Sequence, residues 1–87
     1  MHAVVSTVTV DNVEEARALL ASARVSLVAR APGLVCAYWL EPIDGIGMSM
    51  LVFDSEQHAR EAAAYPVPPM AGVKLTSMTI REVFGHV

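Results

Sequence analysis

Apolar and polar residues alternate along four stretches of this chain, and the alternation predicts four β-strands. All four stretches are also apolar on both faces, because large apolar side chains occupy odd and even positions alike. Tyr38 and Trp39, for example, are neighbours that must point to opposite sides of a sheet. The predicted strands cover Ala3–Val10, Leu34–Glu41, Ile46–Phe53 and Val73–Phe84.

Two other stretches have helical spacing. The first, Asn12–Arg30, begins with Asp11 and Glu14, which resemble a capping box, and ends before Pro32 and Gly33. Its apolar stripe leaves Arg17 and Arg24 on other faces. The stripe consists of Ala16, Leu19, Leu20, Ala23 and Leu27.

The second helix is predicted over Ser55–Tyr65, with Asp54 or Ser55 as its cap. Small residues form its inner stripe, so this helix can approach a sheet closely. They are Ala59, Ala62 and Ala63. Three prolines within 66–69 then predict an extended connector.

The elements follow the order β-α-β-β-α-β, and Asp44-Gly45 predicts a tight hairpin between the second and third strands. This order predicts an α+β fold, a ferredoxin-like single domain over residues 1–87. It would have a four-stranded antiparallel sheet and two helices on one face. Periodicity does not tell which strand face meets the helices, since both are apolar.

Two helices cover one face of such a sheet, so the second apolar face needs another cover. The chain has 87 residues, 54% of them hydrophobic, and its one cysteine, Cys36, allows no internal disulfide. A second copy of the chain is the simplest cover, and we expect a homodimer formed through the sheet face.

Charge and hydropathy exclude other partners. The net charge is -3 and Lys74 is the only lysine, so nothing resembles the clustered cations of a nucleic-acid interface. No apolar run is long enough to cross a membrane, and the first residues lack the cationic start of a signal peptide. With one free cysteine, this pattern predicts a cytoplasmic protein.

The chain resembles the dimeric α+β barrel superfamily, and most closely its small antibiotic-biosynthesis-monooxygenase-like members. The resemblance covers nearly the whole chain but rests on few positions. They are Ala31-Pro32-Gly33-Leu34, Tyr38-Trp39-Leu40 and Val52-Phe53-Asp54-Ser55-Glu56 followed by Ala59.

The resemblance implies a homodimer with its two sheets face to face, helices outside and a hydrophobic pocket between each sheet and its helices. The end of the last strand often reaches the partner in such dimers. Relatives include quinone-forming monooxygenases without a cofactor and haem-degrading enzymes. His58 is the only histidine near the second helix, and Asn12 the only asparagine, so this chain departs from the catalytic patterns of both groups.

Four side chains are candidates for binding a ligand: Tyr38, Trp39, Met48 and Met50. Whichever aromatic ring faces the pocket would stack on an aromatic ligand, and methionines suit an adaptable apolar wall. The alternative for all four is plain packing in a core or an interface.

Catalytic candidates are few. His2 and His86 lie near the termini, where the first and last strands can meet, and one of them is a candidate general base. Arg81 is a candidate for stabilising an anion. Exposure to solvent is the alternative for all three, and pairing across the dimer interface is a further alternative for Arg81. No residues have metal-ligand spacing, and a mid-strand Cys36 predicts an inert thiol.

Two functions remain open at this point. In the first, the protein binds, and oxidises or isomerises, a small apolar or aromatic molecule without metal or flavin. In the second, it is a non-catalytic protein whose apolar surface serves self-association or a partner.

Overall fold

A computed structural model describes residues 1–64 and 72–87, apart from the Ala23 side chain. The predicted helix end at Tyr65 and the proline-rich connector therefore lie outside the described residues. The strands are β1 (His2–Val10), β2 (Leu34–Ile43), β3 (Ile46–Phe53) and β4 (Val73–Glu82). They form one antiparallel sheet in the order β2-β3-β1-β4.

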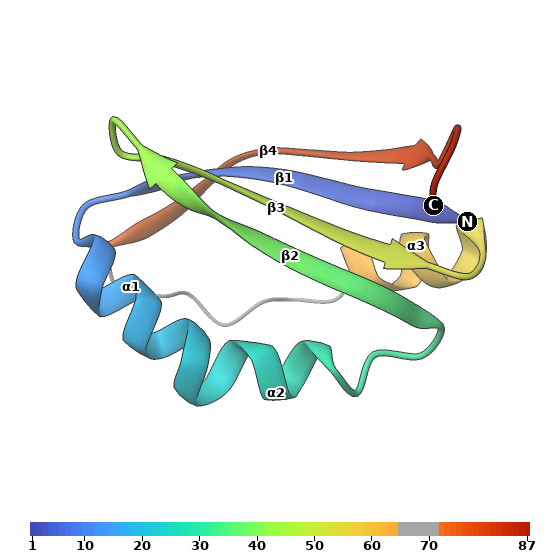
Figure 1. Cartoon of the computed structure of the whole chain (residues 1–87), viewed down its shortest axis with the longest axis horizontal. Helices are drawn as coiled ribbons and strands as arrows, with labels where there is room; N and C mark the ends of the chain where they lie inside the picture. The colour runs from blue at the N-terminus through green and yellow to red at the C-terminus, as the bar shows by residue number, and fades with distance from the viewer. Residues whose placement is uncertain (65–71) are drawn as a thin grey trace.

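The helices of the described residues all lie on one side of this sheet (Figure 1). A long helical stretch follows β1 and contains α1 (Val13–Leu19), a π-helical segment η1 (Leu20–Arg24) and α2 (Val25–Val28). The shorter α3 (Glu56–Ala64) follows β3. The predicted α+β class and antiparallel four-stranded sheet are confirmed. Within the described part of the chain, no helix is both long and apolar enough to span a membrane.

The predicted hairpin forms between β2 and β3, and its loop is Asp44-Gly45. Asp44 has a φ of 53° and Gly45 a φ of 76°. Positive φ at both central residues is the backbone of the type I′ turn, which matches the twist of the flanking strands. The strands continue to the turn, so β2 ends at Ile43, beyond the predicted Glu41.

Two irregularities change the predicted strand faces. The β2–β3 register shifts between Leu34 and Cys36, and Leu34 packs against the core while Cys36 does not share its face. Regular alternation would place Leu34 and Cys36 on one face, but a bulge adds a residue between them. A second shift, between Thr7 and Val8 on β1, moves Leu75 of β4 to the face of Val8.

The first helix begins one residue later than predicted. Asn12 is its N-cap, and its side-chain oxygen accepts a hydrogen bond of 3.0 Å from the Glu15 amide. The predicted cap, Asp11, instead donates its backbone N–H to the Gly72 carbonyl at 2.8 Å. This hydrogen bond continues the pairing of β1 with β4 and keeps Asp11 at the end of the strand. Asn12 is therefore the residue that caps the helix.

The π-helical segment corrects the predicted helix stripe. The Val25 amide bonds to the Leu20 carbonyl, an i→i+5 bond that fits an extra residue into one turn. After this bond, the residues that face the sheet come one position later than regular α-helical spacing predicts. Arg24 and Val28 border the sheet-side cavities described below, whereas Leu27, a predicted stripe residue, is 55% exposed.

The core lies at the α3 end of the sheet. Phe53 and Ala59 are fully buried, Val4 is nearly so, and Ala62 and Ala63 pack against them. The predicted small-residue stripe of α3 is thus confirmed. Its helix start is capped by the Ser55 hydroxyl, which accepts from the His58 amide at 3.2 Å.

The sheet face opposite the helices is exposed and apolar. We call it the open face, and Tyr38, directly opposite Met50, lies near its centre. Its large apolar side chains are 40–73% accessible. They are Tyr38, Leu40, Ile43, Ile46, Met48 and Met50.

Candidate functional site

A cavity of about 670 Å³ lies between the sheet and the long helical stretch. It exists because that stretch stands away from the sheet: no residue of α1 or α2 is buried. In Figure 1 this stretch runs beneath the sheet, while α3 lies close against one end of it. We call this space the central cavity. A smaller cavity of about 60 Å³ adjoins it toward α3 and the core residue Val4.

One row of residues crosses the sheet on the side that faces both cavities. Trp39 on β2 lies opposite Ser49 on β3, which lies opposite Ser6 on β1, which lies opposite Met78 on β4. All four border both cavities. The row therefore offers two hydroxyl groups at the middle of the sheet, with an aromatic ring and a thioether on either side.

Arg24, on the long helical stretch, is a charged residue that borders both cavities. Its side chain is partly buried, and this burial lowers the pKa of its guanidinium from the ordinary value. Among the described residues it makes no ion pair and no side-chain hydrogen bond. A partly buried cation without a partner is costly, so the position calls for an explanation.

Other charged residues border the central cavity nearer to solvent. Arg17 and Glu41 form an ion pair of 3.9 Å, and their side chains are 70% and 77% exposed. Lys74, on β4, is also exposed. Ion pairs between such exposed side chains contribute little to stability. The Arg17–Glu41 pair therefore does not explain why the cavity is present.

The four predicted ligand-binding residues separate. Trp39 lies on the cavity side, opposite Ser49, and borders both cavities. Met48 borders the central cavity as well, but, like Met50 two residues later, it belongs to the open face. Tyr38 and Met50 alternate to the open face and border neither cavity. Met78, a further methionine of the sequence, lies on the cavity side.

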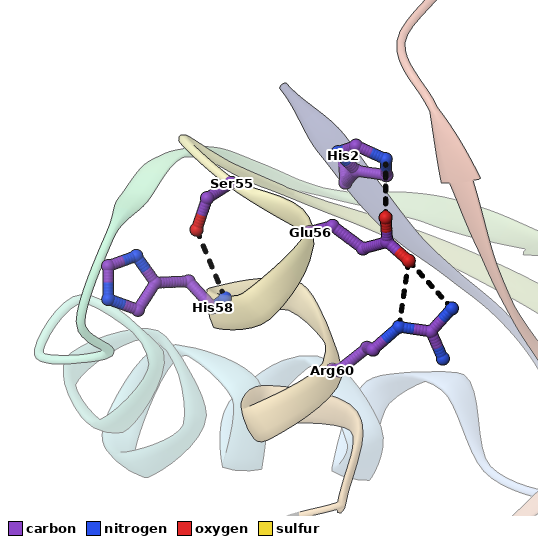
Figure 2. Close-up of polar contacts among 5 residues, drawn as sticks. All are labelled: His2, Ser55, Glu56, His58 and Arg60. Atoms are coloured by element: carbon purple, nitrogen blue, oxygen red, sulfur yellow. Dashed lines mark hydrogen bonds and ion pairs between the residues drawn. The ribbon is translucent and has the colours of Figure 1, made fainter.

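His2 belongs to a polar cluster at the edge of β1 and α3 (Figure 2). Its Nε2 lies 3.6 Å from Glu56, whose carboxylate also accepts from Arg60 at 2.7 and 2.9 Å. Arg60 lowers the pKa of the Glu56 carboxyl. The His2 Nδ1 atom is buried and has no hydrogen-bond partner among the described residues. His2 borders neither cavity.

The remaining predicted residues lie away from the central cavity. Arg81, opposite Ala3, is exposed on the side of the open face, and His86 is exposed in the segment after β4. The termini do meet as predicted, since the Val83 amide donates to the Met1 carbonyl at 2.9 Å. Cys36 is partly buried.

His58 pairs with Asp54 instead of facing a ligand site. Its Nδ1 lies 2.5 Å from the Asp54 carboxylate, and the hydrogen bond raises the pKa of His58 and lowers that of Asp54. In Figure 2 the His58 ring lies apart from the His2–Glu56–Arg60 cluster. Among the described residues, no group of three or more His, Cys, Asp or Glu is placed to hold a metal ion.

Ser6, Ser49 and Arg24 were not predicted as site residues. A signal existed for the serines, because each interrupts an otherwise apolar face of its strand. Arg24 gave a weaker signal: it stands four residues after Leu20, beside the apolar stripe, but its charge led to the prediction of another face.

Comparison with known proteins adds no assignment to this geometry. No family model matches the chain, and no similar protein was found among curated proteins or solved structures.

Proposed function

We propose that the protein binds a small, largely apolar, aromatic molecule in the central cavity. The observation that carries this proposal is a cavity of about 670 Å³ with the only tryptophan of the chain at its floor. Pockets for small molecules typically measure about 300–1,000 Å³ and combine apolar walls with a few polar groups.

The lining supports an aromatic ligand with at least one polar substituent. Val8, Leu20 and Leu75 provide apolar wall, while Trp39 offers a ring face for stacking. Ser6 and Ser49 place hydroxyls at the centre of the floor, where they would orient a polar group of the ligand.

We further propose that two copies pack through the open face, in the ferredoxin-like, dimeric-barrel arrangement that the sequence resembles. The chain exposes 6178 Å². A compact monomer of 9.3 kDa exposes about 5,000 Å². The excess of roughly 1,200 Å² is more than the ~800 Å² that each partner buries in a standard interface. Phe84, beyond the end of β4, is fully exposed and is available to a partner.

Oxidation of the ligand without metal or flavin stays a prediction of the resemblance. Such chemistry needs a substrate that itself gives an electron to oxygen, so the protein supplies only a dry, shaped site and one or two polar groups. The central cavity is the place where this chemistry would occur. The second candidate function is self-association alone, and the exposed open face is the observation that favours it.

A cavity-filling variant tests the binding proposal. Ser49→Leu places a large side chain on the cavity floor, whereas Met50→Leu changes the next residue, on the open face. We expect 2-naphthamide, a neutral aromatic probe, to quench Trp39 fluorescence saturably in the wild type and in Met50→Leu, but not in Ser49→Leu. Equal quenching in all three would contradict binding in the cavity, and no quenching in any would favour self-association alone.

Native mass spectrometry tests the dimer and also detects any ligand carried over from purification. Met50 and Val25 are similarly exposed, at 40% and 43%, but Val25 lies on the long helix. We expect a dimer for the wild type and for Val25→Asp, and a monomer for Met50→Asp. A monomeric wild type would refute the dimer proposal.

A further inference from the structure

The central cavity carries more positive than negative charge, although the chain as a whole has a net charge of -3. Three cationic side chains border it, from Arg17, Arg24 and Lys74. One carboxylate, that of Glu41, borders it as well, and this carboxylate already lies beside Arg17. The cavity is thus suited to a ligand that brings negative charge.

Arg24 is the cation placed for direct contact with such a ligand. Arg17 and Lys74 are exposed to solvent, which screens their charges. Arg24 borders the inner, smaller cavity as well as the central one, and none of the nine carboxylate side chains pairs with it. Burial disfavours its charged form and so lowers the pKa of its guanidinium. A bound anion would supply the missing partner.

The groups that share both cavities with Arg24 suit an acidic oxygen. Ser6 and Ser49 lie opposite one another on neighbouring strands, so their hydroxyls are adjacent donors on the cavity floor. A guanidinium donates two parallel hydrogen bonds to a planar carboxylate, a geometry that a lysine does not match. Trp39, next in the same row, is placed to stack on a ring attached to that carboxylate.

The helix departs from regular geometry beside this cation. In an uninterrupted α-helix Arg24, four residues after Leu20, already lies near the sheet-facing side, whereas Val28 would turn away from it. The i→i+5 bond from Val25 to Leu20 moves the positions after Arg24 by one and brings Val28 to the sheet, where it borders the smaller cavity together with Arg24. Single π-helical turns within α-helices occur frequently at functional sites.

We infer that the ligand of the central cavity is an aromatic carboxylic acid, or an aromatic molecule with an equally acidic oxygen, whose anion is bound by Arg24 together with the Ser6 and Ser49 hydroxyls. This inference rests on the proposed function and specifies its ligand class. It assigns Arg24 a binding role, with the aromatic body held by Trp39 and the apolar wall.

A matched pair of probes tests the inference. 2-Naphthoate and 2-naphthamide share one fused ring and differ in the charge of one substituent. Calorimetric titration would compare both probes on the wild type, Arg24→Met, Arg24→Lys and Arg30→Met. Arg30 is an exposed residue near the helix end that borders neither cavity, so its removal controls for net charge.

We expect the wild type and Arg30→Met to bind 2-naphthoate about tenfold or more tightly than 2-naphthamide, the effect of one charge-assisted contact. In Arg24→Met the two affinities should become equal through loss of naphthoate binding alone. Arg24→Lys should keep part of the preference. Without ligand, Arg24→Met should melt at a higher temperature than the wild type, because an unpaired, partly buried charge has been removed.

Several results would overturn the inference, each in a different way. Equal affinity of the wild type for both probes, or an equal loss of both in Arg24→Met, would refute the acidic ligand and leave aromatic binding standing. Absence of binding for both probes would refute the aromatic-binding function and the inference together. A lower melting temperature of Arg24→Met with unchanged probe preference would show that Arg24 is structural.

Discussion

Gly33→Ala should destabilise the protein more than the same substitution at Gly45. Both glycines have nearly the same left-handed backbone, with φ of 77° and 76°. A non-glycine residue in this region costs about 1–2 kcal/mol. Loss of unfolded-state freedom on replacing Gly by Ala offsets part of this cost, and it does so equally at both sites. The backbone cost therefore cancels in the comparison.

The surroundings of the two glycines differ. A Cβ at Gly33 would lie 2.5 Å from the Asp54 carboxylate and closer still to the His58 ring, far inside ordinary contact distance. At Gly45 the nearest atom, the Val10 carbonyl oxygen, lies 3.5 Å away. In Gly33→Ala the His58 ring must leave its position, at the cost of an unfavourable rotamer and of its bond to Asp54. We expect a loss of about 2–3 kcal/mol for Gly33→Ala and about 1–2 kcal/mol for Gly45→Ala.

Urea denaturation of the two variants measures this difference directly. The His58→Ala background removes the ring that the new Cβ meets and releases the Asp54 side chain from its hydrogen bond, so there Gly33→Ala should cost less than in the wild-type background. Equal losses for the two variants in the wild-type background would refute the reasoning. So would an unchanged cost of Gly33→Ala in the His58→Ala background.

Three further predictions concern stability. The Asp54–His58 pair raises the pKa of His58 above 6.5 and lowers the pKa of Asp54 below 3.8. Between pH 3.8 and pH 6.5 both groups are charged in the folded protein, so the wild type should be more stable than Asp54→Asn by the full contribution of the pair. This difference in stability should shrink as the pH rises through the raised pKa of His58, and the two melting temperatures should lie closer together at about pH 9 than at about pH 5.5. Phe53→Ala empties the centre of the core and should cost about 3–5 kcal/mol, most of the stability of a small domain, as seen by circular dichroism. Asn12→Ala removes the helix cap and should cost about 1 kcal/mol in urea denaturation, whereas Asp11→Ala should cost clearly less.

Strand positions and the hairpin could be predicted because their signals are local. Alternation located each strand to within two residues, and Asp44-Gly45 alone determined a turn with positive φ at both positions. The face of each strand that meets the helices could not be predicted, because both faces are apolar. That choice depends on α3, whose Ala59 and Ala63 pack on the side of Val4 and Phe53.

The bulges and the π-helical turn could not be predicted for a different reason. Each inserts one residue, and the benefit of the insertion comes from partners distant in sequence, such as Leu75 beside Val8. Local spacing therefore predicted Leu27 on the inner face of the long helix, where the structure has Val28. The prediction that Asp11 caps the helix failed for a similar reason. Its backbone amide donates a hydrogen bond to the carbonyl of Gly72, which is distant in the sequence.

Most of these departures from local rules converge on one place. The π-helical turn, the β1–β4 bulge, the two serines and Arg24 all lie at the central cavity, while the regular α3 covers the packed core. The bulge at Leu34 is the exception, since it lies at the core. Hydroxyls in a sheet face, a partly buried cation with no ion-pair partner among the described residues and an irregular helix each reduce stability, and chance would scatter them along the chain. Their concentration around a cavity fits a binding site, where a ligand offsets these costs when it binds. A core that had merely packed poorly would have apolar walls, and not two hydroxyls and a guanidinium at the same cavity.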